Sequence, residues 1–268
     1  MPIVYACIAP HGGHLLLGKN EPTPVPHSRA AFVTMERDLR AAHPDSVAVL
    51  TPHGIYVEGK ISLGFTPQAQ GEIDGASATV ETDLDLAADW AYKATARGVP
   101  VAPLTAREPN GVLQLDWGVV IPLVLLAANL TPIPPMTVAC PARDVSRDHL
   151  VAWGEALAEA ADEQNRRVAL IVSADQGHGH AADGPYDFTP ESARYDRAMQ
   201  EAIEADDLPR LLDWEENFAE DALADSYWQT LALIGVQKHV PLRARFLSYE
   251  IDHYFGLLCA SFTLEGGG

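Results

Sequence analysis

The 268-residue sequence has few cysteines and little positive charge. Its three cysteines, Cys7, Cys140 and Cys259, lie far apart among apolar residues. An odd and dispersed set argues against a disulfide framework or a cysteine-ligated zinc cluster, and it is typical of reduced thiols in a cytoplasmic protein. Lysine and arginine number 18 against 37 acidic residues, which gives a formal net charge of -19. Such a surface repels phosphate groups, so we expect neither nucleic acid nor a membrane as a partner.

Long apolar runs and targeting signals are also lacking. The most apolar stretch, residues 118–130, is shorter than the ~18 residues of a membrane span and contains Pro122, so we expect a buried helix there. No basic segment precedes the short apolar run at the start, which argues against a signal peptide. We therefore expect a cytoplasmic chain that folds as a single domain over residues 1–264, followed by a flexible end at residues 265–268.

Apolar runs typical of strands alternate with segments of helical periodicity. The sequence predicts strands at residues 3–9, 45–50, 136–140, 167–172 and 243–247. It predicts helices at residues 28–42, 81–97 and 146–165, and further helices over residues 189–236 with a break near Pro209. Ser28 is the expected N-cap of the first helix. There is no internal repeat. This alternation is typical of an α/β fold with a mainly parallel central sheet flanked by helices.

Chemically active side chains follow four of these predicted strands. They are His11 in Pro10-His11-Gly12, His53 in Pro52-His53-Gly54, His178 in a turn that also holds Asp175, and Glu250 after the last strand. Because the carboxyl ends of parallel strands share one edge of a sheet, these residues can converge on one active site.

Two imidazoles and one carboxylate form the ligand set that leaves open positions on Fe(II) for substrate and dioxygen. The remaining histidine could then act as acid or base, because its ordinary pKa lies near neutrality. The same ligand types also suit Zn(II), and Mn(II) is a further alternative.

Four motifs in order resemble a known family. They are Ala9-Pro10-His11-Gly12, Thr51-Pro52-His53-Gly54, Ser173 to His178, and Ser248-Tyr249-Glu250. Together they resemble the class III extradiol ring-cleaving dioxygenases, specifically the catalytic LigB-type subunit, from about residue 3 to residue 263. The resemblance implies an enzyme that uses Fe(II) and O2 to open the ring of a catechol-type or aminophenol-type aromatic.

The resemblance also implies roles for individual residues. His11, His53 and Glu250 match the metal ligands, His178 matches the base that deprotonates the substrate, and Asp175 would orient a histidine. The expected substrate-binding residues are Trp117, Gly12, His180 and Tyr249. Trp117 departs from the family, because many members have histidine at this position. Its indole only donates a hydrogen bond, so it either stacks on an aromatic ring or packs in the core.

Two alternative functions stay open. A non-enzymatic relative of the MEMO branch would share the fold and act through binding, and a zinc-dependent hydrolase would use the same ligand types. The sequence has no HExxH motif in support of the hydrolase. The expected partners are a small aromatic substrate and O2, with a homo-oligomer or a small partner subunit left open. The acid-rich segment of residues 201–225 is expected to be a solvated helical face.

Overall fold

A large mixed sheet forms the centre of the computed structural model, which describes residues 2–18, 21–106, 111–127 and 130–264. Its strands lie in the order β10-β11-β1-β9-β2-β8-β3-β6. Their bounds are β10 (Leu242–Asp252), β11 (Phe255–Leu264), β1 (Ile3–Ala9), β9 (Val168–Ser173), β2 (Ser46–Leu50), β8 (Met136–Pro141), β3 (Ile61–Gly64) and β6 (Val101–Leu104). β1, β9, β2 and β8 pair in parallel, which confirms the predicted mainly parallel sheet.

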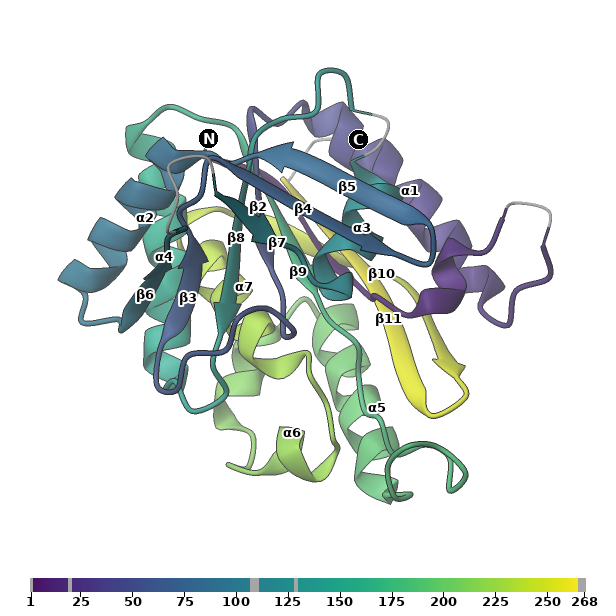
Figure 1. Cartoon of the computed structure of the whole chain (residues 1–268). Coiled ribbons are helices and arrows are strands. Elements are labelled where there is room, and N and C mark those ends of the chain that lie inside the picture. The colour runs from purple at the N-terminus through teal and green to yellow at the C-terminus, as the bar shows by residue number, and fades with distance from the viewer. Residues whose placement is uncertain (1, 19–20, 107–110, 128–129, 265–268) are drawn as a thin grey trace.

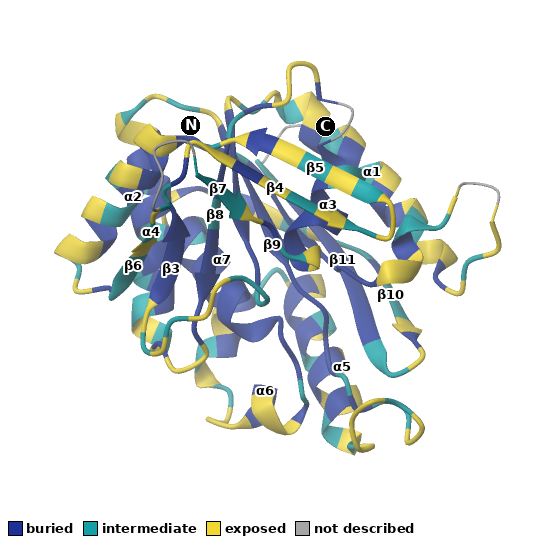
Figure 2. Ribbon diagram, in the orientation of Figure 1, coloured by how far each residue is buried: buried dark blue, intermediate teal, exposed yellow. Residues whose placement is uncertain are grey.

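The middle strands are buried on both faces. Every residue of β2 and β9 is buried, in keeping with their uninterrupted apolar sequences. Figure 2 shows these central strands in dark blue, whereas the outward faces of the surrounding helices carry exposed stretches. The carboxyl ends of β1, β9 and β2 are therefore three neighbouring points on one rigid edge.

Helices cover both faces of this sheet. One face packs against α1 (Pro26–Ala42) and α3 (Trp117–Leu126), and the other against α2 (Leu84–Ala96), α4 (Arg147–Glu163), α5 (Pro190–Glu204) and α7 (Tyr227–His239). The remaining helical turns are η1 (Gly13–Leu16), η2 (Leu208–Asp213) and α6 (Phe218–Asp221). Among the described residues, no helix is long and apolar enough to cross a membrane.

A second, three-stranded sheet was not expected from the sequence. It has the order β5-β4-β7 and consists of β4 (Gln68–Ile73), β5 (Ala76–Glu81) and β7 (Val112–Gln114). The β4–β5 hairpin closes at Asp74 and Gly75, both at positive φ, which the Asp-Gly pair favours. Exposed positions alternate along β4, so its sequence lacks the apolar run that revealed the central strands.

The last two strands and the first helix each correct a further expectation. β10 extends to Asp252 and forms an antiparallel hairpin with β11, which separates it from β1. Figure 1 shows this hairpin in yellow at one side of the sheet, opposite α2 and β6. Glu250 thus belongs to an edge strand. In addition, α1 begins at Pro26, so Ser28 lies within the helix and is not its N-cap.

Candidate metal centre

Three neighbouring strands deliver the centre of the site. His11 follows β1, Asp175 follows β9 and His53 follows β2, and these strands are adjacent in the sheet. His11 Nε2 lies 3.0 Å from His53 Nε2 and 3.4 Å from Asp175 Oδ2. Of the four residues expected to converge at this edge, the structure thus brings His11 and His53 together, with Asp175 beside them.

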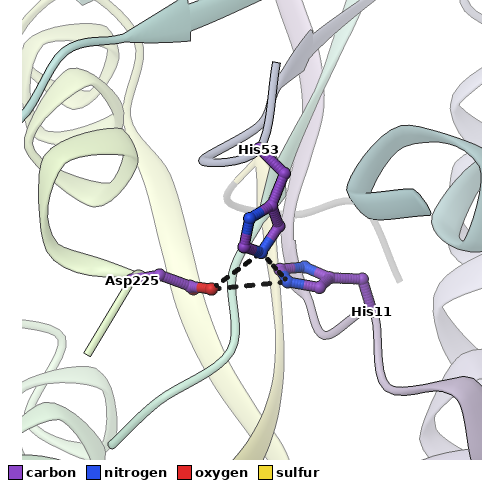
Figure 3. Close-up of side chains that lie close together, drawn as sticks. All are labelled: His11, His53 and Asp225. Carbon is purple, nitrogen blue, oxygen red and sulfur yellow. Dashed lines mark hydrogen bonds and ion pairs between the residues drawn. The ribbon is translucent and has the colours of Figure 1, made fainter. Parts of the chain in front are cut away.

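Asp225 completes the cluster from outside the sheet. It precedes α7, and its Oδ2 lies 3.1 Å from His53 Nε2 and 3.5 Å from His11 Nε2. Figure 3 shows the three side chains pointing toward one another. Asp225 is 2% exposed. The expectation that residues 201–225 form only a solvated face is thus wrong at its last residue.

The spacing of the three atoms fits a cation. Ligand bonds of about 2.1 Å at right angles would place neighbouring donor atoms about 3.0 Å apart. Asp225 Oδ1 accepts a hydrogen bond of 2.8 Å from the backbone N–H of Asp175, whereas the buried Oδ2 has no hydrogen-bond donor among the described residues. His11, His53 and Asp225 are also the group of residues that could hold a metal ion. Two nitrogens and one oxygen are suitable donors for a divalent transition metal.

The tautomer of His11 follows from its other ring nitrogen. Ser173 Oγ donates to the carbonyl oxygen of Gly118, which can only accept. His11 Nδ1 lies 2.9 Å from the same hydroxyl, so this nitrogen must carry the proton and donate to it. A neutral His11 therefore presents the lone pair of Nε2 to His53 and Asp225. Such an outer hydrogen bond fixes the orientation of a metal-binding imidazole.

The buried charges of the cluster stabilise one another. Burial alone would lower the pKa of His11, but Asp175 and Asp225 outweigh it and raise that pKa to about 9. Burial raises the pKa of Asp175. For Asp225 the effect of burial is overcome by His11 and His53, which hold its pKa well below the ordinary range. Without a metal, positive charge in the cluster is carried by a proton on His11.

Trp117 lies against the second histidine. Its ring stacks on His53 with centroids 4.2 Å apart and planes at 27°, and 46% of the residue stays exposed. Thr51 Oγ1 donates to Asp116 and accepts from the backbone N–H of His53, which ties the start of α3 to the loop after β2. Of the two readings of Trp117, the structure supports a ring that stacks at the site over a ring buried in the core.

His178 lies beside the cluster within an aromatic wall. Its ring stacks on Phe255 with centroids 5.5 Å apart and has Tyr186 and Tyr254 at 6.0 Å. It lies close enough to Asp175 and Asp225 to act to lower the pKa of each carboxyl. Nδ1 of His178 is buried and has no hydrogen-bond partner among the described residues. His178 therefore adjoins the centre without being one of the three grouped ligands.

Glu250 is not part of the cluster, which corrects its assignment as a metal ligand. Its carboxylate accepts hydrogen bonds from the backbone N–H groups of Ser28, at 2.7 Å, and His27, at 3.2 Å. These donors lie in the first turn of α1, where helical N–H groups have no partner within the helix. The carboxylate of the metal-binding group comes from Asp225 instead.

The other expected substrate-binding residues are divided between two places. Gly12 follows His11, and a Cβ there would lie 3.0 Å from the Phe255 ring, so the backbone passes close to the aromatic wall. His180 and Tyr249 are directed elsewhere, because both donate to Asp196 Oδ2, at 2.8 and 2.7 Å. The structure thus places His180 and Tyr249 in a partly buried hydrogen-bond network around Asp196 rather than at the cluster.

Comparisons with known proteins agree with the fold. The family described as the catalytic LigB subunit of aromatic ring-opening dioxygenase matches residues 5–256. Protein CA_C1420 of Clostridium acetobutylicum is 20% identical over 242 residues, covering 87% of this chain and 51% of that protein. The chain therefore spans about half the length of this curated relative. An uncharacterized protein, JW3007 from Escherichia coli K12, has a similar fold, with a TM-score of 0.65, 14% identity, and coverage of 96% of this chain and 99% of that one.

Proposed function

We propose that this chain, which belongs to the family of catalytic LigB subunits of aromatic ring-opening dioxygenases, is an Fe(II)-dependent enzyme that opens the ring of a catechol-type or aminophenol-type substrate with O2. The observation that carries the proposal is the convergence of two Nε2 atoms and one carboxylate oxygen within 3.0–3.5 Å. Two histidines and one carboxylate are typical of non-haem Fe(II) oxygenases.

The chain's own residues would hold the metal and position the reactants. His11, His53 and Asp225 would bind the ion, which when bound supplies open coordination positions for the ring oxygens and for O2. Ser173 fixes the tautomer of His11, and the backbone N–H of Asp175 fixes the direction of the Asp225 carboxylate. His11 and Asp225 are therefore each oriented by a second group before any ion binds.

His178 is the proposed base. Its Nδ1 is buried without a hydrogen-bond partner among the described residues, so the other ring nitrogen, Nε2, of this half-buried residue would accept the proton from a ring hydroxyl. The neighbouring rings of Tyr186, Tyr254 and Phe255 restrict the access of water to this imidazole. The partly exposed face of Trp117 provides a surface on which an aromatic substrate can stack.

Oxygen uptake tests the proposed reaction. The protein loaded anaerobically with Fe(II) should consume O2 with at least one member of a panel of catechols and aminophenols and form a ring-opened product. In His178→Ala we expect metal to be retained and turnover to fall roughly 100-fold or more. Metal binding without oxygen uptake across the panel would instead favour a zinc-dependent hydrolase or a MEMO-like binding protein.

Metal analysis tests the ligand set separately. Asp225→Asn removes the charge with little change in shape, and we expect it to weaken Fe(II) binding at least ~100-fold. Asp221→Asn is the matched control, because Asp221 is an exposed acid of the same segment. Equal metal binding by Asp225→Asn and Asp221→Asn would remove Asp225 from the site.

A further inference from the structure

A buried series of hydrogen bonds joins α5 to the residues that directly follow Asp175 and Asp225. Tyr195 of α5 is fully buried, and its hydroxyl lies 2.8 Å from Ser226 Oγ. Ser226 Oγ in turn donates to Gln176 Oε1 at 2.9 Å. Ser226 directly follows Asp225, and Gln176 directly follows Asp175. One tyrosine is thus linked to the two chain segments that carry the acidic side chains of the cluster.

Gln176, the last residue of this hydrogen-bonded series, determines which hydroxyl donates to which. The side-chain oxygen of Gln176 can only accept, so the hydroxyl proton of Ser226 points to it. The Tyr195 hydroxyl must therefore donate to Ser226 Oγ. Both segments are held in a fixed relation by consecutive, one-way hydrogen bonds.

The position of Asp225 depends on this relation. Its Oδ1 is held by the backbone N–H of Asp175, at 2.8 Å, and this bond sets which oxygen faces the two imidazoles. Gln229 reinforces the arrangement, because its Nε2 donates to the backbone carbonyls of Asp225, at 2.7 Å, and Ser173, at 2.9 Å. A shift of Ser226 relative to Gln176 would move Asp225 relative to Asp175 and change the direction of Oδ2.

We propose that Tyr195 is a positioning residue for the metal centre: through Ser226 and Gln176 its hydroxyl holds Asp225 in the geometry that binds the ion. The inference rests on the metal-binding part of the proposed function and is independent of the substrate. Tyr195 touches neither His11 nor His53 among the interactions of the described residues, so its effect must pass through the backbone next to Asp225.

Metal affinity of the full chain tests the inference. Tyr195→Phe deletes only the hydroxyl, and Ser226→Ala deletes the middle member of the chain. Tyr5→Phe is the matched control, because Tyr5 is also fully buried but its hydroxyl has no hydrogen-bond partner among the described residues. Fe(II) affinity is measured anaerobically by competition with a chelator, and thermal unfolding of the metal-free variants reports changes in stability alone.

We expect Tyr195→Phe and Ser226→Ala each to weaken Fe(II) binding roughly 5- to 10-fold, at the low end of the effect of groups that orient metal ligands. Tyr5→Phe should stay within about twofold of the unaltered chain. If the unaltered chain binds Fe(II) and both test variants bind it equally well, the positioning role is wrong although the metal site stands. If the unaltered chain binds no divalent metal, the proposed function and this inference both fail.

Discussion

The carboxylate of Glu250 accepts a hydrogen bond of 2.7 Å from the backbone N–H of Ser28 and so caps α1 from the neighbouring edge strand. A second bond comes from the N–H of His27. The negative charge also lies at the positive end of the helix dipole, where it is stabilising. Glu250, whose sequence context resembles that of a metal ligand, thus has a structural role. Its side chain, from β10, caps the first helix, which is the role that the sequence predicts for Ser28.

Replacing Glu250 should therefore change stability and leave metal binding intact. We expect Glu250→Ala to lower the free energy of unfolding of the metal-free chain by about 1 kcal/mol, as loss of a helix cap does. Glu250→Gln keeps an acceptor and should lose less. Chemical denaturation measures the stability, and chelator competition measures the Fe(II) affinity. A large loss of iron binding in Glu250→Ala with unchanged stability would return this residue to the metal site.

Metal affinity should rise with pH up to about pH 9. The pKa of His11 is raised to about 9 because Asp175 and Asp225 outweigh the effect of burial. The proton on His11 stabilises the metal-free chain fully below pH ~6.5, the ordinary value for histidine, and this contribution is lost as the pH rises through 9. A metal ion must displace that proton, so binding is weakest at low pH.

The gain in melting temperature on metal addition measures this linkage. We expect the increment to grow from pH 6.5 to pH 8.5 at a fixed concentration of free metal. In Asp175→Asn one of the two carboxylates is replaced by a neutral amide, so His11 should lose its proton at lower pH. The increase in the melting-temperature gain should then occur at lower pH than in the unaltered chain. An increment that stays constant or shrinks over this range would contradict the assignment of the proton to His11.

Stacking by Trp117 should stabilise the metal-binding position of His53. The two rings lie 4.2 Å apart, and such aromatic pairs contribute about 0.5–1.5 kcal/mol beyond their buried area. Trp117→Ala should therefore weaken Fe(II) binding roughly 2- to 10-fold, whereas Trp117→Phe keeps an aromatic ring and should lose less. Tyr92→Ala removes another exposed aromatic ring, with no ring contact at the site, and serves as the control. Unchanged iron affinity in Trp117→Ala would limit Trp117 to substrate contact.

The sequence was sufficient to predict a site residue where a local motif also fixes the place of that residue in the fold. Apolar strands ending in Pro-His-Gly identified His11 and His53, because in a parallel sheet a strand end is enough to place a residue at the edge. Asp225 could not be found in this way, since it comes from a loop before α7 and is the tenth acid between residues 201 and 225. Its burial depends on how α7 packs against β1 and β9. Its apolar neighbours, Ala222, Ala224 and Tyr227, were the only local signal.

Glu250 was misplaced for a different reason. The sequence predicts a strand over residues 243–247 that ends in Ser248-Tyr249-Glu250, but the strand continues to Asp252 and pairs with β11 instead of β1. Alternation along β10 directs the Glu250 carboxylate to the start of α1, whereas Tyr249 contacts Asp196 of α5. Strand length and pairing are set by residues distant in sequence, so they lie beyond what a local motif can indicate.

Asp196 should orient the turn that carries His178. Its Oδ1 accepts from the backbone N–H of Gly177 at 2.7 Å, and its Oδ2 accepts from His180 and Tyr249. The residues before and after His178 in this turn are thus held by one buried carboxylate, which is 2% exposed. Asp196→Asn retains an acceptor for Gly177 but weakens the bonds to His180 and Tyr249, so the imidazole of His178 loses its fixed direction.

We expect Asp196→Asn to lower kcat with an aromatic diol roughly 10-fold while Fe(II) affinity stays within about twofold, because a base must lie within hydrogen-bond reach of the proton it accepts. Tyr249→Phe removes one of the three bonds and should cause a smaller loss in kcat. Asp187→Asn, a change at an exposed acid in the same loop region, is the control. Steady-state kinetics at several pH values distinguish a displaced base from general destabilisation. Only a displaced base alters the pH dependence of kcat in a protein that remains folded and iron-loaded. If kcat and its pH dependence match those of the unaltered chain, the turn is held without Asp196.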